Sequence, residues 1–183
     1  MRSRGAGSSP RTHHYGRDLR VAPWIEPLAA ALAGAPSFRG CALRAARRED
    51  EEFLFALHRS AMREYVEATW GWDERWQRAH FTSTYAPGRH AVIVRVEPIP
   101  ADIGRISVTR HWRKFFLRDI ELVAAERNHG LGAAMIQALV ALAHAEGRAV
   151  ELLVLKCNPA QRLYVRLGFQ FIADDGARLT MRA

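Results

Sequence analysis

A run of six residues carries the clearest chemical signal in this sequence: Arg127-Asn128-His129-Gly130-Leu131-Gly132. Its two glycines let the backbone come close to a ligand. Apolar residues at helical spacing follow, so the glycines stand where a helix begins, and the first N–H groups of a helix have no internal partners. Those groups and the positive end of the helix dipole would bind a phosphate-bearing group.

Spacing separates three kinds of phosphate-binding loop. A Walker loop ends in Gly-Lys-Ser/Thr, whereas Gly132 is followed by Ala133 and Ala134, which excludes that type. A dinucleotide fingerprint has a small residue three positions after the second glycine, and Met135 stands there, so this type fits poorly. The third kind of loop has the pattern Arg-x-x-Gly-x-Gly/Ala after a strand, and this sequence fits it. A plain strand-to-helix turn with incidental glycines is the alternative to it.

Regular elements must hold this loop in place. Residues 116–123 are rich in branched and aromatic residues, which favours a strand before the loop. The apolar stripe after the loop runs to Leu142, and Gly147 ends the expected helix. Residues 150–156 then form a nearly continuous apolar strand, and a strand reached through one helix is expected to lie parallel to the first.

The sequence from residue 41 onward predicts one domain of alternating strands and helices. Three of the strands form an antiparallel meander, and the last two form a hairpin. Asp73 caps one helix, and Asn158 caps another with proline after it. The expected strands cover residues 41–45, 90–96, 103–109, 114–123, 150–156, 169–172 and 178–182. The expected helices cover residues 49–69, 74–84, 131–147 and 160–167.

Residues 1–40 contain four prolines and five glycines without a sustained apolar period. We expect a mostly disordered basic leader, within which residues 24–32 could dock as a short helix, and one folded domain over residues 41–183. The net charge of +8 is divided evenly between the leader and the rest, and no basic cluster is interleaved with aromatic residues. The sequence therefore predicts no nucleic-acid partner.

No apolar run approaches the ~20 residues that cross a membrane, so no membrane partner is expected. The two cysteines, Cys41 and Cys157, lie far apart and show no metal spacing, which favours a reduced, cytoplasmic protein without a metal.

Two motifs together resemble the GNAT superfamily of N-acetyltransferases. The first is the glycine loop. The second is Asn158-Pro159-Ala160-Gln161-Arg162-Leu163-Tyr164-Val165-Arg166-Leu167-Gly168-Phe169, which follows the first after one helix and one strand. The resemblance covers about residues 41–183. It implies an α/β (α+β) fold with a mixed, mostly antiparallel sheet, helices on both faces and one central parallel strand pair splayed at the cofactor site.

The resemblance also implies acetyl-coenzyme A (acetyl-CoA) as co-substrate and a primary amine, small-molecule or peptide, as acceptor. Backbone groups of Leu122 and Val123 would pair with the pantetheine arm, and the loop from Arg127 to Ala133 would receive the pyrophosphate. Asn158 would contact the arm. Tyr164 would lie near the sulfur, where a phenol can protonate the leaving thiolate.

The general base is not identified by this resemblance. A period of two puts Asp119 and Glu121 on one face of their strand, and Glu121 is the candidate base. A water chain to Glu67 or His111 is an open alternative.

Three tryptophans within seven residues predict either hydrophobic anchoring of two helices or a wall of the acceptor site. Trp70 and Trp72 are therefore candidate substrate-binding residues. A non-catalytic module that binds acyl-CoA is the alternative function, and a nucleic-acid-binding protein that uses the basic leader is a third. We expect a monomer or a homodimer.

Overall fold

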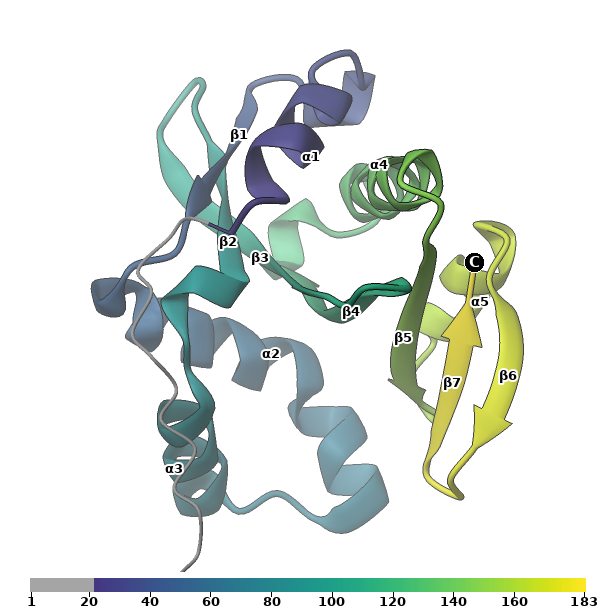
Figure 1. Cartoon of the computed structure of the whole chain (residues 1–183). Helices are drawn as coiled ribbons and strands as arrows, with labels where there is room; N and C mark the ends of the chain where they lie inside the picture. The colour runs from purple at the N-terminus through teal and green to yellow at the C-terminus, as the bar shows by residue number, and fades with distance from the viewer. Residues whose placement is uncertain (1–21) are drawn as a thin grey trace, which may run out of the picture.

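The structure, a computed structural model, describes residues 22–183 (Figure 1). Seven strands form one sheet in the order β1-β2-β3-β4-β5-β7-β6. Every neighbouring pair is antiparallel except β4 and β5, which are parallel, so the expected mixed sheet is confirmed. The strands are β1 Cys41–Ala45, β2 His90–Arg95, β3 Ala101–Arg110, β4 Lys114–Leu122, β5 Ala149–Leu155, β6 Gln170–Asp174 and β7 Arg178–Arg182.

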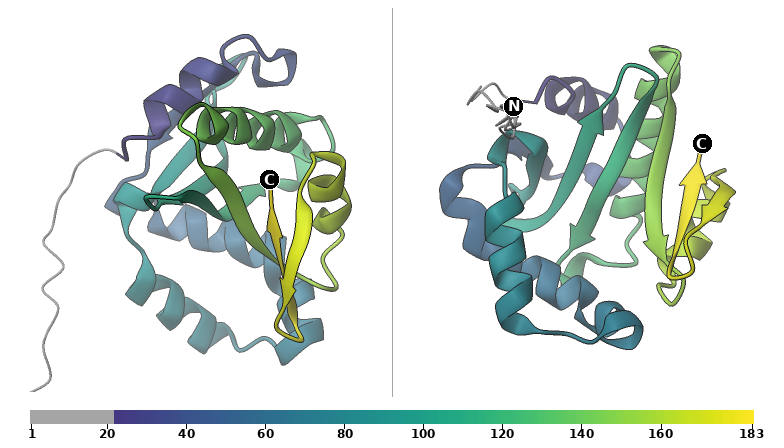
Figure 2. Two further views of the ribbon diagram at one scale, coloured as in Figure 1. Left: turned by 45° about the vertical axis from the view of Figure 1, so that its right-hand side comes forward. Right: turned by 60° about the horizontal axis from the view of Figure 1, so that its bottom comes forward.

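Helices cover both faces of this sheet. Figures 1 and 2 show α1 and α4 on one face and α2 and α3 on the other. The helices are α1 Ile25–Leu32, α2 Glu51–Trp70, α3 Glu74–Thr84, α4 Leu131–Ala145 and α5 Ala160–Arg166. The predicted cap of α3 is present, because Asp73 Oδ1 accepts a hydrogen bond from the Trp76 amide at 2.9 Å. Within residues 22–183, no helix has the length and apolar character needed to cross a bilayer.

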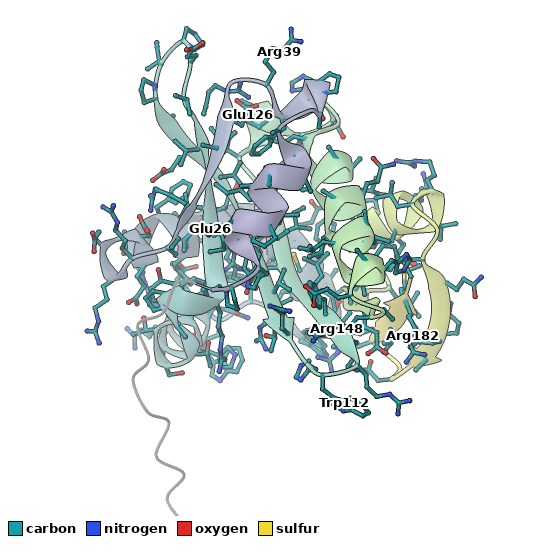
Figure 3. The ribbon with its side chains drawn as sticks, turned by 45° about the horizontal axis from the view of Figure 1, so that its top comes forward. Glu26, Arg39, Trp112, Glu126, Arg148 and Arg182 are labelled. Carbon is teal, nitrogen blue, oxygen red and sulfur yellow. The ribbon has the colours of Figure 1, made fainter. Side chains whose placement is uncertain are left out.

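The N-terminal segment differs from the expected leader. From Ala22 onward the chain is ordered and belongs to the core, and α1 lies beside α4, with Glu26 on its outer side (Figure 3). Trp24, Leu28 and Leu32 are at most 2% exposed. The docked helix over residues 24–32 is thus present, whereas disorder up to residue 40 is wrong, because burial against α4 outweighs the proline and glycine content. Residues 1–21 lie outside the described residues.

The parallel pair β4–β5 separates halfway along its length. Its register runs only from Lys114 opposite Ala149 to Leu117 opposite Leu152. Beyond that point β4 continues against β3, and β5 continues against β7. Arg118 falls at an irregularity in the β3–β4 register, and such bulges bend a strand and increase its twist. The bulge accounts for the splay and opens a gap between the two strands.

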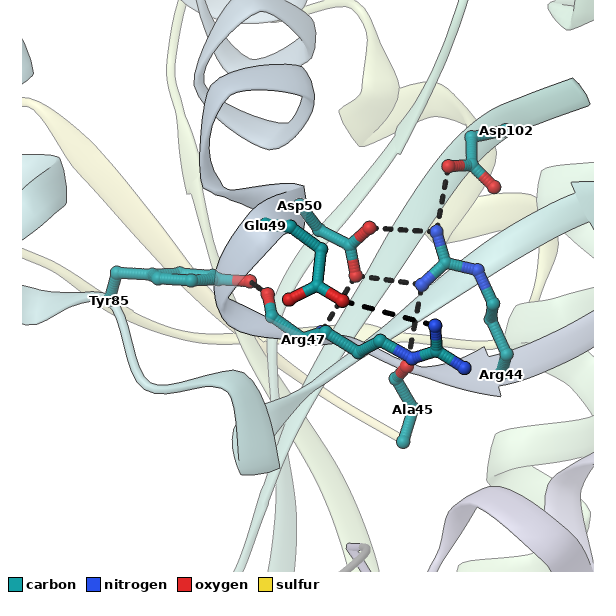
Figure 4. Close-up of polar contacts among 7 residues, drawn as sticks. All are labelled: Arg44, Ala45, Arg47, Glu49, Asp50, Tyr85 and Asp102. Carbon is teal, nitrogen blue, oxygen red and sulfur yellow. Dashed lines mark hydrogen bonds and ion pairs between the residues drawn. The ribbon is translucent and has the colours of Figure 1, made fainter. Parts of the chain in front are cut away.

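An ion-pair network attaches the start of α2 to the sheet (Figure 4). Arg44 of β1 donates to both carboxylate oxygens of Asp50, at 2.7 and 2.8 Å, and to Asp102 of β3 at 2.7 Å. The hydrogen bonds from Arg44 lower the pKa of Asp50, although burial opposes them. The Arg47 amide also donates to Asp50 at 2.7 Å. This network fixes α2 across β3 and β4, next to the splay.

Candidate active site

The glycine loop lies between η4 (Ala124–Glu126), which follows the free end of β4, and the first turn of α4. Gly130 is the N-cap of α4 with φ 84°, and Asn128 has φ 65°, both in the left-handed region. No described side chain caps α4, and the first helical hydrogen bond runs from the Ala134 amide to the Gly130 carbonyl at 3.0 Å. The N–H groups of residues 131–133 are therefore directed at a ligand, as an anion site requires.

Arg127 ties this loop to the strand before it. Its Nε donates to the Leu122 carbonyl at 2.8 Å. Its Nη2 is buried and has no hydrogen-bond partner among the described residues. A buried donor without a partner is costly, and a phosphate oxygen would satisfy it. The loop residues therefore fit a phosphate-bearing ligand on two independent observations, the uncapped helix start and this orphaned donor.

The backbone groups expected to pair with the pantetheine arm differ in their partners. The Val123 amide donates to the Ile103 carbonyl at 2.9 Å, because this residue still pairs with the β3 side of the sheet. The Val123 carbonyl accepts from the Glu126 amide at 3.0 Å and keeps a second lone pair. The Leu122 carbonyl accepts from Arg127 and has a second lone pair for a ligand.

The N-terminal segment borders the same loop. A Cβ added at Gly130 would lie 3.7 Å from Cβ of Ser37, in the short 3-10 turn η1 (Pro36–Phe38). Glu126, just before the loop, pairs with Arg95 of β2, with a 3.0 Å contact from the arginine Nε to Oε1. Arg39 and Glu126 both lie at this end of the molecule (Figure 3). The segment predicted to be a mostly disordered leader therefore lies against the predicted cofactor loop.

Tyr164 of α5 is buried, and its ring lies 5.7 Å from that of Phe169. No hydrogen bond of its hydroxyl is found within residues 22–183, and the residue is 9% exposed. Burial, together with the negative charges of Asp119 and Glu121, raises the pKa of Tyr164 to about 12. The phenol is therefore protonated at neutral pH, and it lies within electrostatic reach of the carboxylates on β4.

Asn158 lies between β5 and α5. Its Oδ1 accepts a hydrogen bond from the Ala160 amide at 2.9 Å, although Pro159 is the N-cap, one residue later than predicted. Its Nδ2 lies 4.0 Å from the Met62 sulfur of α2. The neighbouring Cys157 sulfur lies 3.5 Å from both the Thr69 hydroxyl and the Tyr65 carbonyl. These contacts bring the second half of α2 against the residues that follow β5.

Glu121 lies in a buried cluster of charges with Arg105 and His58. It accepts from Arg105 Nε at 2.8 Å and Nη2 at 3.1 Å, and its Oε1 lies 2.9 Å from His58 Nδ1. Burial alone would raise the pKa of Glu121, but the Arg105 charge and the His58 contact outweigh it and lower the pKa to about 2. Asp119, on the same strand face as predicted, lies 3.3 Å from Arg105.

This environment conflicts with the prediction that Glu121 is the general base, because a carboxylate with so low a pKa has little affinity for a proton. The two alternatives lie away from the splay. Glu67 is exposed and lies 3.8 Å from Arg63. His111 is exposed in the turn before Lys114, at the opposite end of β4 from Glu121.

Sequence reasoning missed His58, whose side chain is 20% exposed. A polar residue between Leu54 and Met62, which share its side of α2 at spacings of four, could have indicated it. The buried positions of α2 are Leu54, Phe55, Leu57 and Val66.

Possible metal ligands come together once within residues 22–183, where atoms of His58, Asp119 and Glu121 lie within 4.8 Å of one another. Arg105 already pairs with both carboxylates and supplies the positive charge that a metal ion would otherwise bring. The cluster is therefore better suited to holding the imidazole than to binding a cation.

The two candidate acceptor-binding tryptophans differ in position. Trp72 is half-buried between α2 and α3, where its Nε1 donates to Glu74 at 2.8 Å and its ring lies 6.4 Å from that of His58. Trp70, the last residue of α2, is 59% exposed. The structure thus brings Trp72 to the charge cluster and leaves Trp70 at the edge of the same helix pair.

Comparisons with known proteins agree with this geometry. A family model described as "Acetyltransferase (GNAT) family" matches residues 51–169, more than half of the chain. No curated protein sequence matches the chain.

Solved structures resemble the fold over most of the chain. The PaiA N-acetyltransferase from Thermoplasma acidophilum, in complex with coenzyme A, has a TM-score of 0.61 and 16% identity over 78% of this chain and 97% of that one. An acetyltransferase from Thermus thermophilus has a TM-score of 0.59 and 14% identity over 78% and 96%. Naa50 from Arabidopsis thaliana, with the bisubstrate analogue CoA-Ac-MVNAL, has a TM-score of 0.52 and 11% identity over 79% and 98%. At these identities the likeness shows a common fold.

Proposed function

Because the chain belongs to the GNAT family of acetyltransferases, we propose that it transfers an acetyl group from acetyl-CoA to a primary amine. One observation carries this proposal. The strands β4 and β5 separate beyond Leu117 and Leu152, and the uncapped start of α4 follows the free end of β4. The gap accommodates an extended thioester arm, and the loop accommodates the diphosphate to which that arm is attached. The structures with coenzyme A and with a bisubstrate analogue support the same ligand class.

The residues of the loop divide the binding among them. The amides of Leu131, Gly132 and Ala133 donate to the pyrophosphate, and Gly130 keeps the approach free of a side chain. Arg127 adds its unpartnered Nη2, while its Nε holds the Leu122 carbonyl. Asn128 and His129 are exposed and border the entrance.

Transfer is direct, within a ternary complex of enzyme, thioester and amine. The amine nitrogen attacks the thioester carbonyl carbon, and the carbon–sulfur bond breaks. Tyr164 donates its proton to the leaving sulfur, for which its unpartnered, protonated hydroxyl is suited. Asn158 lies at the end of β5 and borders the arm on that side. Trp70 and Trp72 border the acceptor from α2 and the α2–α3 connection.

Thermal unfolding with and without acetyl-CoA tests the binding step, because a ligand that binds only the folded state raises Tm. Gly130→Asp should abolish the shift by placing a side chain and a negative charge at the pyrophosphate site. Gly147→Asp is the matched control. It introduces the same residue at another left-handed glycine, with φ 65°, beyond the opposite end of α4, and should keep the shift. An unchanged shift in Gly130→Asp would show that the loop is misassigned.

A panel of primary amines, with detection of the released thiol, tests the transfer step. Release that depends on both acetyl-CoA and one class of amine supports the proposal. A Tm shift without thiol release on any amine would instead identify the alternative, a domain that binds acyl-CoA without turnover.

A further inference from the structure

We propose that His58 is the general base that deprotonates the acceptor amine, and that Glu121 positions it. This inference rests on the proposed function and names the proton acceptor of that reaction. It is carried by the contacts of the imidazole ring and by the path of α2 across the splayed strands.

The shorter of two contacts favours one tautomer of His58. Its Nδ1 atom lies 2.9 Å from Glu121 Oε1 and 3.4 Å from Arg105 Nη2. The carboxylate only accepts hydrogen bonds, so the closer contact places the hydrogen on Nδ1. The lone pair is then on Nε2. No hydrogen bond of this atom is found among the described residues, and the His58 side chain is 20% exposed. An acceptor amine can therefore reach the one nitrogen that is able to take its proton.

The aromatic rings around His58 restrict the imidazole from the other sides. The Phe81 ring of α3 lies 6.0 Å from it, with 32° between the ring planes, and the Trp72 ring lies 6.4 Å away. These rings limit access of water to a ring that is 20% exposed and leave a mainly apolar wall for the carbon skeleton of an acceptor. Trp72 thus joins the two helices and also forms part of the wall that faces the acceptor.

The path of α2 puts this imidazole over the gap. His58 and Met62 are four residues apart and share one face of the helix. His58 contacts Glu121 at the free end of β4, whereas Met62 contacts Asn158 after β5. This face of α2 therefore spans the space between the separated strands, where the thioester carbonyl must lie if the arm occupies the gap.

Glu121 is paired on both sides within the charge cluster. Arg105 lies 2.8 Å from Glu121 and 3.3 Å from Asp119. The same Glu121 carboxylate lies 2.9 Å from His58 Nδ1 and so holds the imidazole in place. Glu121 acts through His58 and has no need to accept the proton itself.

The proton balance of the step is complete. His58 Nε2 takes one proton from the ammonium nitrogen of the acceptor, whose freed lone pair forms the carbon–nitrogen bond. The carbon–sulfur bond breaks, and the sulfur receives the Tyr164 proton. The second nitrogen proton returns to the tyrosinate through solvent, and His58 releases its proton to solvent. The products are the amide, the free thiol and one proton.

The test uses the full chain and an amine found by the panel. His58→Asn keeps a side-chain N–H donor for Glu121 but removes the base, so kcat should fall by ~10²–10⁴ while the acetyl-CoA-dependent rise in Tm persists. His144→Asn, at an exposed histidine in the last turn of α4, is the matched control and should leave kcat unchanged. Added imidazole should restore part of the activity of His58→Ala.

A second arm tests the positioning role. Glu121→Gln should lower kcat in the wild-type background, with little change in KM for acetyl-CoA, and should cause little further loss in His58→Asn. Additive losses would show that Glu121 does not act through His58. A kcat of His58→Asn within a few-fold of wild type would overturn the base assignment while leaving the proposed function intact. A wild-type protein that neither binds acetyl-CoA nor releases thiol would instead refute the proposed function, and this inference with it.

Discussion

Leu28→Ala should destabilise the protein substantially, because α1 forms part of the core. Leu28 is fully buried and packs in the cluster that also contains Met135 and Leu139 of α4. Leucine-to-alanine changes at such sites cost about 2–5 kcal/mol through lost burial and a residual cavity. The helix lies at the surface of the domain and can partly close the space, so we expect the lower half of this range, about 2–3 kcal/mol. For a chain of this length that lowers Tm by about 4–12 °C.

Urea unfolding followed by circular dichroism measures this change as a lower midpoint at an unchanged slope. Glu26→Ala is the matched control, since Glu26 lies in the first turn of the same helix and is exposed, and it should change stability by less than about 0.5 kcal/mol (Figure 3). Equal stability of the two variants would refute the packing of α1 and restore the view of residues 1–40 as a leader. A chain that starts at residue 38 should accordingly lose folded protein, although the sequence pattern predicts that it folds.

Three further outcomes follow from the site. Tyr164→Phe should keep Tm and the acetyl-CoA-dependent shift while lowering kcat by ~10²–10⁴, and near-normal turnover would remove the acid role. Gly104→Ala should destabilise by about 1–3 kcal/mol, measured by urea unfolding, because the new Cβ would lie 2.6 Å from the Glu121 carbonyl oxygen. The pKa of Glu121 is lowered from its ordinary 4.5 to about 2, so its contribution to stability is complete above pH 4.5 and is lost as the pH falls toward 2. Glu121→Gln should flatten this acid-induced fall in Tm, and an unchanged fall would contradict the buried ion pair.

The sequence predicted the elements around the glycine loop and the Asn158 turn because their signals are local. The helix start at Gly130, the strand before it and the Asn158 turn each depend on residues within a few positions of one another. Local chemistry also fixed the bounds of α3, where Asp73 bonds the Trp76 amide. Backbone preferences of this kind act before any tertiary contact forms, so a single sequence suffices to read them.

The position of α1 could not be predicted in this way. Its alanine-rich sequence between prolines gives a weak helical preference, and its burial depends on α4, about a hundred residues later in the chain. The apolar side chains Trp24, Ile25 and Leu28 were visible in the sequence, but their partner surface was not. Composition alone therefore favoured disorder, and tertiary packing decided otherwise.

The acceptor half of the site depends on contacts that no local pattern contains. His58 meets Glu121 across 63 residues and Arg105 across 47, and each of these side chains alone is consistent with an ordinary surface charge. Period-two reasoning did place Asp119 and Glu121 on one face, but it could not show that Arg105 pairs with both of them. A carboxylate bonded to arginine orients a base better than it serves as one. The proposed proton acceptor is therefore His58 of α2, in place of Glu121 of β4. The same arrangement explains why α2 must be anchored by Arg44, Asp50 and Asp102, since a shift of its first turn would move the imidazole away from the gap.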